Sequence, residues 1–270
     1  MNKKLAYPIV LTLAVFMVVA RVQPVRAQEE ISLSPPQVEI AKKTYAEQLD
    51  VYRVKEQRFM VSREQYKQVQ TLASLEEVVK ASKEVQTARI DTLLTYFKVL
   101  QLTMNELKGA ELTKKTVQLE RIQAILTELD VARNRIANSN DRIALDNASA
   151  AYESRNEAYV SAAYGALTLI RIAHTQTATD QLGLLSAQVF DTITAASPEA
   201  SVLAEKQRGY DELARTITQI KDFIRQAFTR SEGFDQYLFT AASYAQITDI
   251  LNSAYAKLKL GENFVKELAK

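Results

Sequence analysis

The sequence contains no cysteine and no tryptophan, and it has a single histidine, His174. Without cysteine, disulfide bonds, thiol catalysis and cysteine-based zinc sites are excluded, so burial of apolar side chains has to stabilise the fold. Helical di-metal sites need an acid three residues before a histidine on each of two helices, and here position 171 is an arginine. We therefore predict no metal and no cofactor, and we expect His174 to be a packed or surface helix residue.

Proline and glycine are also scarce, with five prolines and six glycines in 270 residues. Residues 37–197 contain no proline and only three glycines, which predicts sustained helix. No segment alternates between apolar and polar residues with turn residues at its ends, so we predict no β-sheet.

Apolar residues recur at steps of 4 and 3, the spacing of helices packed side by side at a shallow angle. In the run over residues 119–136, one of these positions is taken by a charged residue, Arg133. The runs are Leu93, Phe97, Leu100, Met104, Leu107; Leu119, Ile122, Leu126, Leu129, Ile136; Tyr210, Leu213, Ile217, Ile220, Ile224; and Tyr244, Ile247, Leu251, Ala254, Leu258.

The predicted fold class is all-α, an elongated antiparallel helical bundle or coiled coil of about five helices. The first helix is expected to run from Gln37 to Lys108, a rod of roughly 110 Å at 1.5 Å per residue. Gly109 is a candidate cap, and residues 138–141 combine poor helix formers whose effect on the helix is left open. The chain is expected to end in two antiparallel helices of about 34 residues each, joined at Gly233. The predicted parts are 1–27 (signal peptide), 28–36 (flexible lead-in), 37–197 (long-helix region) and 198–270 (C-terminal helical hairpin packing on it).

The start of the first long helix is less regular than the rest. Its apolar positions Tyr45, Leu49, Tyr52, Phe59 and Tyr66 are interrupted by charged residues. This pattern argues against a simple two-stranded leucine zipper. Two interpretations stay open: this helix protrudes, or it contacts another chain.

The N-terminus resembles a secretory signal in its order of features. Lys3 and Lys4 precede sixteen uncharged residues, 5–20, and small residues stand at the last and third-last positions before a cut after Ala27. We expect cleavage near Ala27 and an extracytoplasmic location, secreted or periplasmic; the alternative is an uncleaved N-terminal anchor. The leader holds four basic residues and no acid, so the remaining chain has 30 basic and 32 acidic residues. This near-neutral balance gives no support for nucleic-acid binding.

Residues 158–197 carry few charges and many small side chains. One interpretation is a central helix contacted on several sides, with alanine and glycine allowing close approach. The alternative is a segment that enters a membrane after rearrangement, although its longest uncharged run, Ala158 to Ile170, is shorter than a membrane span.

No catalytic motif, calcium loop or phosphate-binding loop is present, so the sequence does not predict an enzyme. The expected function is an exported structural or interaction protein, such as an envelope-associated spacer, adaptor or scaffold. The expected partner is another protein or a second copy, bound through helical seams, with no nucleic acid and no small-molecule ligand. A retained leader would add membrane contact. The alternatives are a secreted membrane-active protein that inserts residues 158–197, and an enzyme that uses scattered carboxylates.

Overall fold

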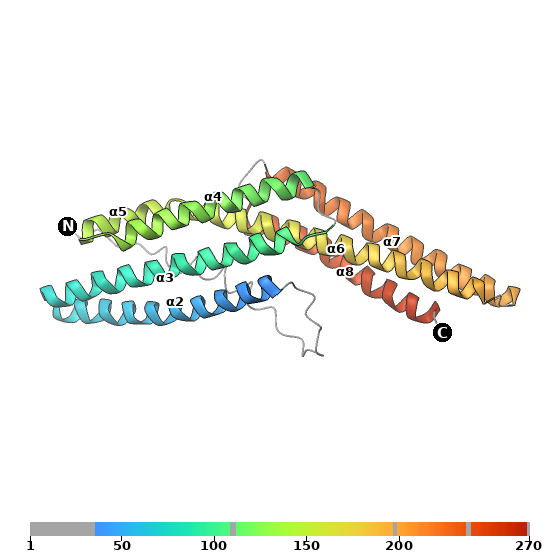
Figure 1. The fold of residues 1–270 in the computed structure, drawn as a ribbon, viewed down its shortest axis with the longest axis horizontal. Helices are drawn as coiled ribbons and strands as arrows, with labels where there is room; N and C mark the ends of the chain where they lie inside the picture. The colour runs from blue at the N-terminus through green and yellow to red at the C-terminus, as the bar shows by residue number, and fades with distance from the viewer. Residues whose placement is uncertain (1–35, 109–111, 197–198, 236–238, 269–270) are drawn as a thin grey trace. The chain divides into compact units, whose positions relative to one another are not determined.

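The structure, a computed structural model, describes residues 36–108, 112–196, 199–235 and 239–268. In these ranges the chain forms seven α-helices and no strand, which confirms the predicted all-α bundle (Figure 1). The expected signal peptide, the lead-in up to residue 35 and Gly109 lie outside the described residues. The helices are α2 (Pro36–Val69), α3 (Leu72–Asn105), α4 (Leu112–Ala137), α5 (Arg142–Glu153), α6 (Asn156–Ala195), α7 (Ala200–Asp235) and α8 (Ala241–Leu268).

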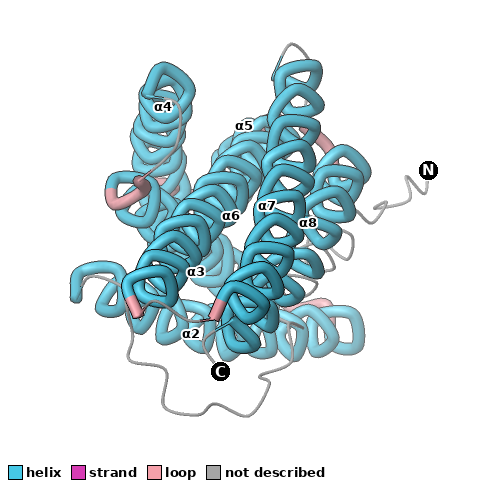
Figure 2. Tube along the Cα trace, turned by 90° about the vertical axis from the view of Figure 1, so that its right-hand side faces the viewer, coloured by secondary structure: helices cyan, strands magenta, loops and turns pink. Residues whose placement is uncertain are grey.

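The unit from Pro36 onward contains two groups of packed helices that share α6. In the first group α2 packs on α3, α3 on α4, and α4 on α5. In the second group α7 and α8 pack on each other, and both pack on α6. Helix α6 also contacts α3 and α4, so it connects the two groups (Figures 1 and 2).

The single rod expected from Gln37 to Lys108 is wrong, because the chain reverses at Gln70 and Thr71 to form the α2–α3 hairpin. Gln70 has a φ of 46°, the left-handed conformation that ends a helix, and its N–H donates to the Tyr66 carbonyl at 2.9 Å. Thr71 then caps α3 by exchanging hydrogen bonds with Ser74. The chain thus reverses without glycine or proline, through the left-handed Gln70 and the capping box that starts α3.

Two further interruptions divide the long-helix region. Residues 138–141 do break the helix: α4 ends at Ala137, and the Asp141 side chain caps α5 by accepting a hydrogen bond from Ala144 N at 2.8 Å. A second break separates α5 from α6 at residues 154–155, where no side chain caps α6. Because of these breaks the described residues hold seven helices, where about five were expected.

The C-terminal helices form an antiparallel hairpin whose turn lies later than expected. Helix α7 continues through Gly233 to Asp235, so Gly233 is not the turn residue. The helices have 36 and 28 residues, against the expected 34 each. Lys206 near the start of α7 donates to the Leu268 carbonyl at the end of α8, at 3.0 Å.

The core follows the predicted apolar runs. Phe97, Met104, Ile122, Leu213 and Leu251 are each at most 1% exposed. Arg133, the charged residue in a predicted seam, lies at the edge of the α3–α4 contact, where its Nε donates to Asp91 Oδ1 at 2.5 Å. The seam thus accepts one charge by placing it opposite an acid.

Candidate interaction surface

Helix α2 lies at the edge of the bundle and uses one face to pack on α3 (Figure 1). Its aromatic residues occupy this inner face. The Tyr52 ring is buried, the Tyr45 ring lies 5.5 Å from that of Tyr96, and the hydroxyl of Thr92 on α3 donates to the Gln48 carbonyl at 3.2 Å. The first part of the irregular apolar run noted in the sequence therefore packs within the chain, so its irregularity does not need the protrusion or the contact with another chain that the sequence left open.

A second run with steps of 4 and 3 follows a neighbouring face of α2, beside the one that packs on α3, and we name it the α2 outer stripe. Every one of its residues is exposed. The exposed fractions of its apolar members are 66% for Ile40, 44% for Val51, 65% for Val54 and 51% for Val61. The outer stripe consists of Ile40, Thr44, Glu47, Val51, Val54, Arg58, Val61, Gln65 and Gln68.

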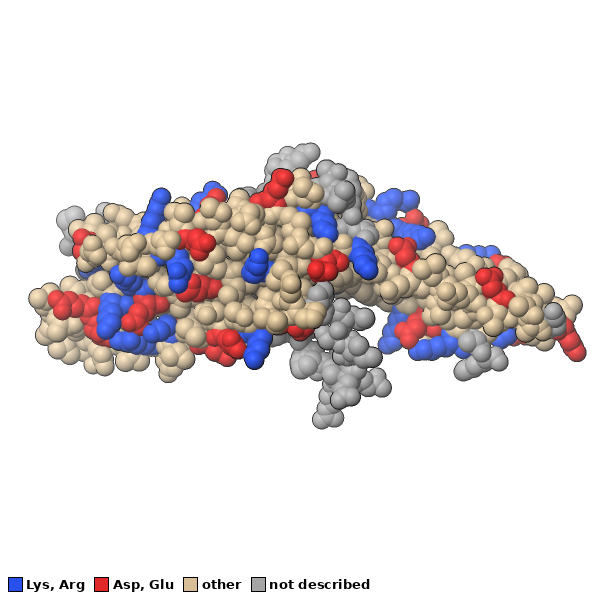
Figure 3. All heavy atoms as spheres, in the orientation of Figure 1, with Lys and Arg blue, Asp and Glu red and all other residues tan. Residues whose placement is uncertain are grey.

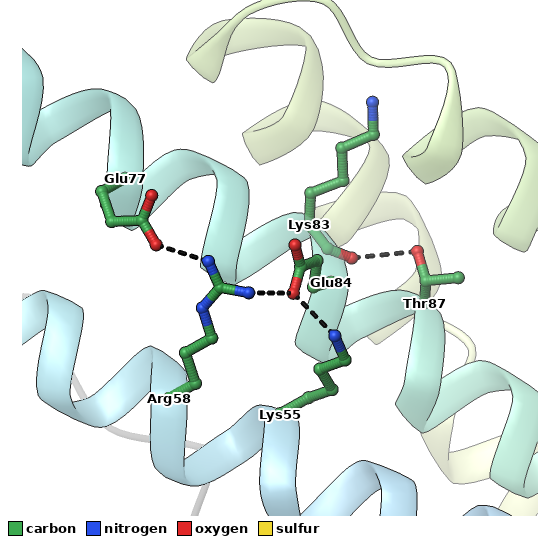
Figure 4. A network of polar contacts seen from close by, with 6 residues as sticks. All are labelled: Lys55, Arg58, Glu77, Lys83, Glu84 and Thr87. Carbon is green, nitrogen blue, oxygen red and sulfur yellow. Dashed lines mark hydrogen bonds and ion pairs between the residues drawn. The ribbon is translucent and has the colours of Figure 1, made fainter.

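Ion pairs between α2 and α3 lie along the edge of the α2 outer stripe. Lys55 and Arg58 of α2 both donate to Glu84 of α3, at 2.9 and 3.0 Å, and Arg58 also donates to Glu77 at 2.7 Å (Figure 4). The hydrogen bond from Lys55 is the main cause that lowers the pKa of Glu84 below its ordinary value, and the charges of Lys55 and Arg58 add to it. Together with the packing of Tyr45 and Tyr52 on the inner face, these contacts set the rotation of α2 about its own axis, and with it the direction of the outer stripe.

The side chain of Arg58 keeps donors for a further acceptor. A guanidinium has five N–H groups, and the two contacts to Glu77 and Glu84 use one hydrogen on each terminal nitrogen. Its side chain is 43% exposed. On the face that Figure 3 shows, acidic and basic side chains alternate without a large area of one sign. The stripe itself carries one acid and one base, Glu47 and Arg58, so an interaction through it depends on individual charges more than on an extended field.

His174 lies on α6 at an exposed position, within electrostatic reach of Lys42 of α2. Burial of the ring lowers its pKa below the ordinary value, and the charge of Lys42 on α2 lowers it further. This placement agrees with the expectation of a packed or surface helix residue. His174 lines neither of two grooves in the described residues, one of about 350 Å³ beside Tyr152 and Arg155 and one of about 400 Å³ beside Asp180 and Lys221.

The low-charge helix is the central one, as the first interpretation of residues 158–197 predicts. Helix α6 contacts α3, α4, α7 and α8, and small residues such as Ala162, Ala166 and Ala173 are fully buried in it. Within the described ranges, no helix has both the length and the apolar character needed to cross a membrane. In the same ranges, no group of three or more acidic or histidine side chains is arranged to hold a metal ion.

Comparison with known proteins identifies no relative: no family model, curated protein or solved structure matches the chain. The α2 outer stripe was missed from the sequence because the aromatic run beside it is the more apolar one. The signal was present nonetheless, since Val51, Val54 and Val61 keep the heptad spacing on their own. Only the structure shows which of the two runs α3 covers.

Proposed function

We propose that this protein is an exported helical scaffold or adaptor that binds a helical partner through the α2 outer stripe. The observation that carries the proposal is a heptad run of nine exposed residues on a helix whose other face packs on α3. Exposed apolar residues scattered singly need no explanation, whereas four of them at heptad positions on one helix face are typical of an interface.

The size of the stripe indicates a weak or transient contact. Covering a valine or isoleucine that is about half exposed stabilises a complex by roughly 1 kcal/mol. The four apolar residues of the stripe together supply on the order of 4 kcal/mol, and association itself costs a comparable amount. The polar members, among them Glu47 and Arg58, then have to find partners for binding to be favourable. Covalent capture is therefore the suitable experiment.

The test places a photo-crosslinking residue at Val54 in the full chain, expressed in its native host, and identifies the attached chains by mass spectrometry. The control carries the same residue at Met60, which is 51% exposed on α2 but lies off the stripe. We expect a defined partner from position 54 that is absent from position 60. Equal, diffuse labelling from both positions would show that the stripe is not a binding surface.

Export is a separate part of the proposal, supported by the order of charged, apolar and small residues at the N-terminus. Mass spectrometry of the protein recovered from outside the cytoplasm should find an N-terminus at Gln28. Recovery of intact Met1 in a membrane fraction would support the retained anchor, and recovery only from the cytoplasm would contradict export.

A further inference from the structure

We propose that the α2 outer stripe binds the same stripe of a second copy of this chain, with the two α2 helices antiparallel. This inference rests on the proposed function and names its partner. The nine stripe residues keep alternating steps of 4 and 3, a mean period of 3.5 residues. A period of 3.5 keeps a row of side chains facing a second helix along a left-handed coiled coil, which a straight helix with 3.6 residues per turn would lose.

The two charged residues of the stripe select the direction. In a parallel pair of identical helices, Glu47 lies against Glu47 and Arg58 against Arg58, and like charges at an interface are unfavourable. In an antiparallel pair centred between residues 52 and 53, Glu47 lies opposite Arg58 of the second copy. The twofold symmetry makes this contact twice, so both charges of each copy are matched.

The same register also pairs the two central valines, while Ile40 lies opposite Gln65. It places Val51 opposite Val54 on both sides of the twofold axis, and Thr44 opposite Val61 in the layers beyond Glu47 and Arg58. A shift by one heptad in one direction places Glu47 opposite Val51, and a shift in the other direction places Arg58 opposite Val54. Each shift covers a charge without a partner, which is costly. The charges therefore fix one register among those that the heptad spacing permits.

The ion pairs on α3 leave Arg58 able to bind the second copy. Its contacts to Glu77 and Glu84 hold the guanidinium on the α3 side of the stripe and leave hydrogens on both terminal nitrogens (Figure 4). The side chain of Glu47 is 63% exposed, and its nearest cation within α2 is Lys43 at 4.0 Å. Glu47 can thus exchange a weak contact within one helix for a charge-assisted hydrogen bond between copies.

The absence of cysteine from the chain makes disulfide crosslinking a direct test. In the proposed register Thr44 lies opposite Val61 of the second copy. A mixture of Thr44→Cys and Val61→Cys proteins should therefore form the mixed disulfide. Neither variant alone should crosslink, because identical positions are 17 residues apart along the axis, about 25 Å, which no disulfide can span. Met60→Cys measures the background from random collisions.

A charge reversal tests the contact that sets the register. Glu47→Arg should weaken self-association about tenfold or more, measured by sedimentation over a concentration series, because it brings two cations together. Glu120→Arg, on an exposed position of α4, changes the net charge by the same amount and should leave self-association unchanged. Circular dichroism melting checks that both variants are folded.

The outcomes separate this inference from the proposed function. Disulfides within Thr44→Cys alone or Val61→Cys alone would show a parallel pair and overturn the inference. Crosslinking no higher than that of Met60→Cys, or equal self-association of Glu47→Arg and the parent, would overturn it as well. Photo-crosslinking from position 54 to a different protein would still support the proposed function, whereas failure of both experiments would remove both proposals.

Discussion

Gly165 of α6 lies directly under the side-chain amide of Gln118 of α4. A Cβ at position 165 would lie 3.2 Å from Nε2 and 3.3 Å from Oε1 of Gln118. Gln118 is only 5% exposed, and its Oε1 has no hydrogen-bond partner among the described residues. The amide and Thr168 also line a small cavity of about 20 Å³. Gly165 thus lets α4 and α6 approach closely, because the absence of a side chain leaves room for the amide of Gln118.

Gly165→Leu should destabilise the protein by about 1 to 3 kcal/mol, because the larger side chain has to displace Gln118 in a packed contact. The matched control is Gly183→Leu on the same helix, where an added Cβ meets nothing within 4 Å. That change should stabilise the fold by several tenths of a kcal/mol through helix propensity. Denaturant unfolding measures both, and a stabilised Gly165→Leu variant would contradict the close approach of α4 and α6.

Gln70→Gly should stabilise the α2–α3 hairpin by about 0.5 to 1 kcal/mol, because glycine adopts the left-handed conformation without the steric cost that glutamine has at a φ of 46°. The control Gln57→Gly lies in an exposed part of α2 and should destabilise by a similar amount. Thermal unfolding of the two variants measures the effect. Changes of the same sign would show that residue 70 is not held in this turn.

The all-α class and the main apolar seams could be predicted from the sequence because both depend on periodicity alone. The reversal at Gln70 could not, since glutamine is an ordinary helix residue and Thr71 and Ser74 form a cap only once the chain has turned. Gly233 gave the opposite error, because the sequence predicted a turn where there is none. A helix tolerates one glycine, and α7 continues through it.

The α2 outer stripe is a second feature that local sequence could not predict. Two heptad runs occupy α2, and local sequence does not say which of them the rest of the chain covers. That choice is made by contacts with distant residues, such as Lys55 with Glu84, which are 29 positions apart. Arg133 illustrates it too, because its seam position becomes acceptable only through Asp91, 42 residues away.

The ion pairs of Glu84 predict a dependence of stability on acid pH. The pKa of Glu84 is lowered in the folded protein, so the carboxylate stabilises the fold above its unfolded value of 4.5, and this contribution is lost as the pH falls through the lowered value. Glu84→Gln should cost about 0.5 kcal/mol at neutral pH, a small effect because the network is partly exposed, and less in acid. Denaturant unfolding across pH 3 to 7 measures the difference.

Lys55→Gln provides the companion measurement, because it removes the main cause of the lowered pKa of Glu84 and leaves the Glu84 carboxylate in place. It should reduce the acid dependence only in part, since Arg58 still donates to Glu84. Identical pH dependence in the parent and in Glu84→Gln would contradict the network of Figure 4.

His174 offers a direct test of the electrostatic effect of Lys42, because the chain has no other histidine and its ring signal in an NMR titration is unambiguous. The measured pKa should lie below 6.5, chiefly through burial of the ring and then through the charge of Lys42. The neutral imidazole is therefore favoured in the folded state, so stability should decline as the pH falls below 6.5 toward the lowered value, and His174→Gln should remove this decline.

Lys42→Gln should raise the pKa of His174 part of the way toward 6.5, because burial of the ring persists. Lys43→Gln is the matched control: it removes the same charge from the next position of α2, where the side chain is 81% exposed. The two variants should differ, since only Lys42 acts on the imidazole. Equal shifts would mean that His174 senses the net charge of the protein and not the side chain of Lys42.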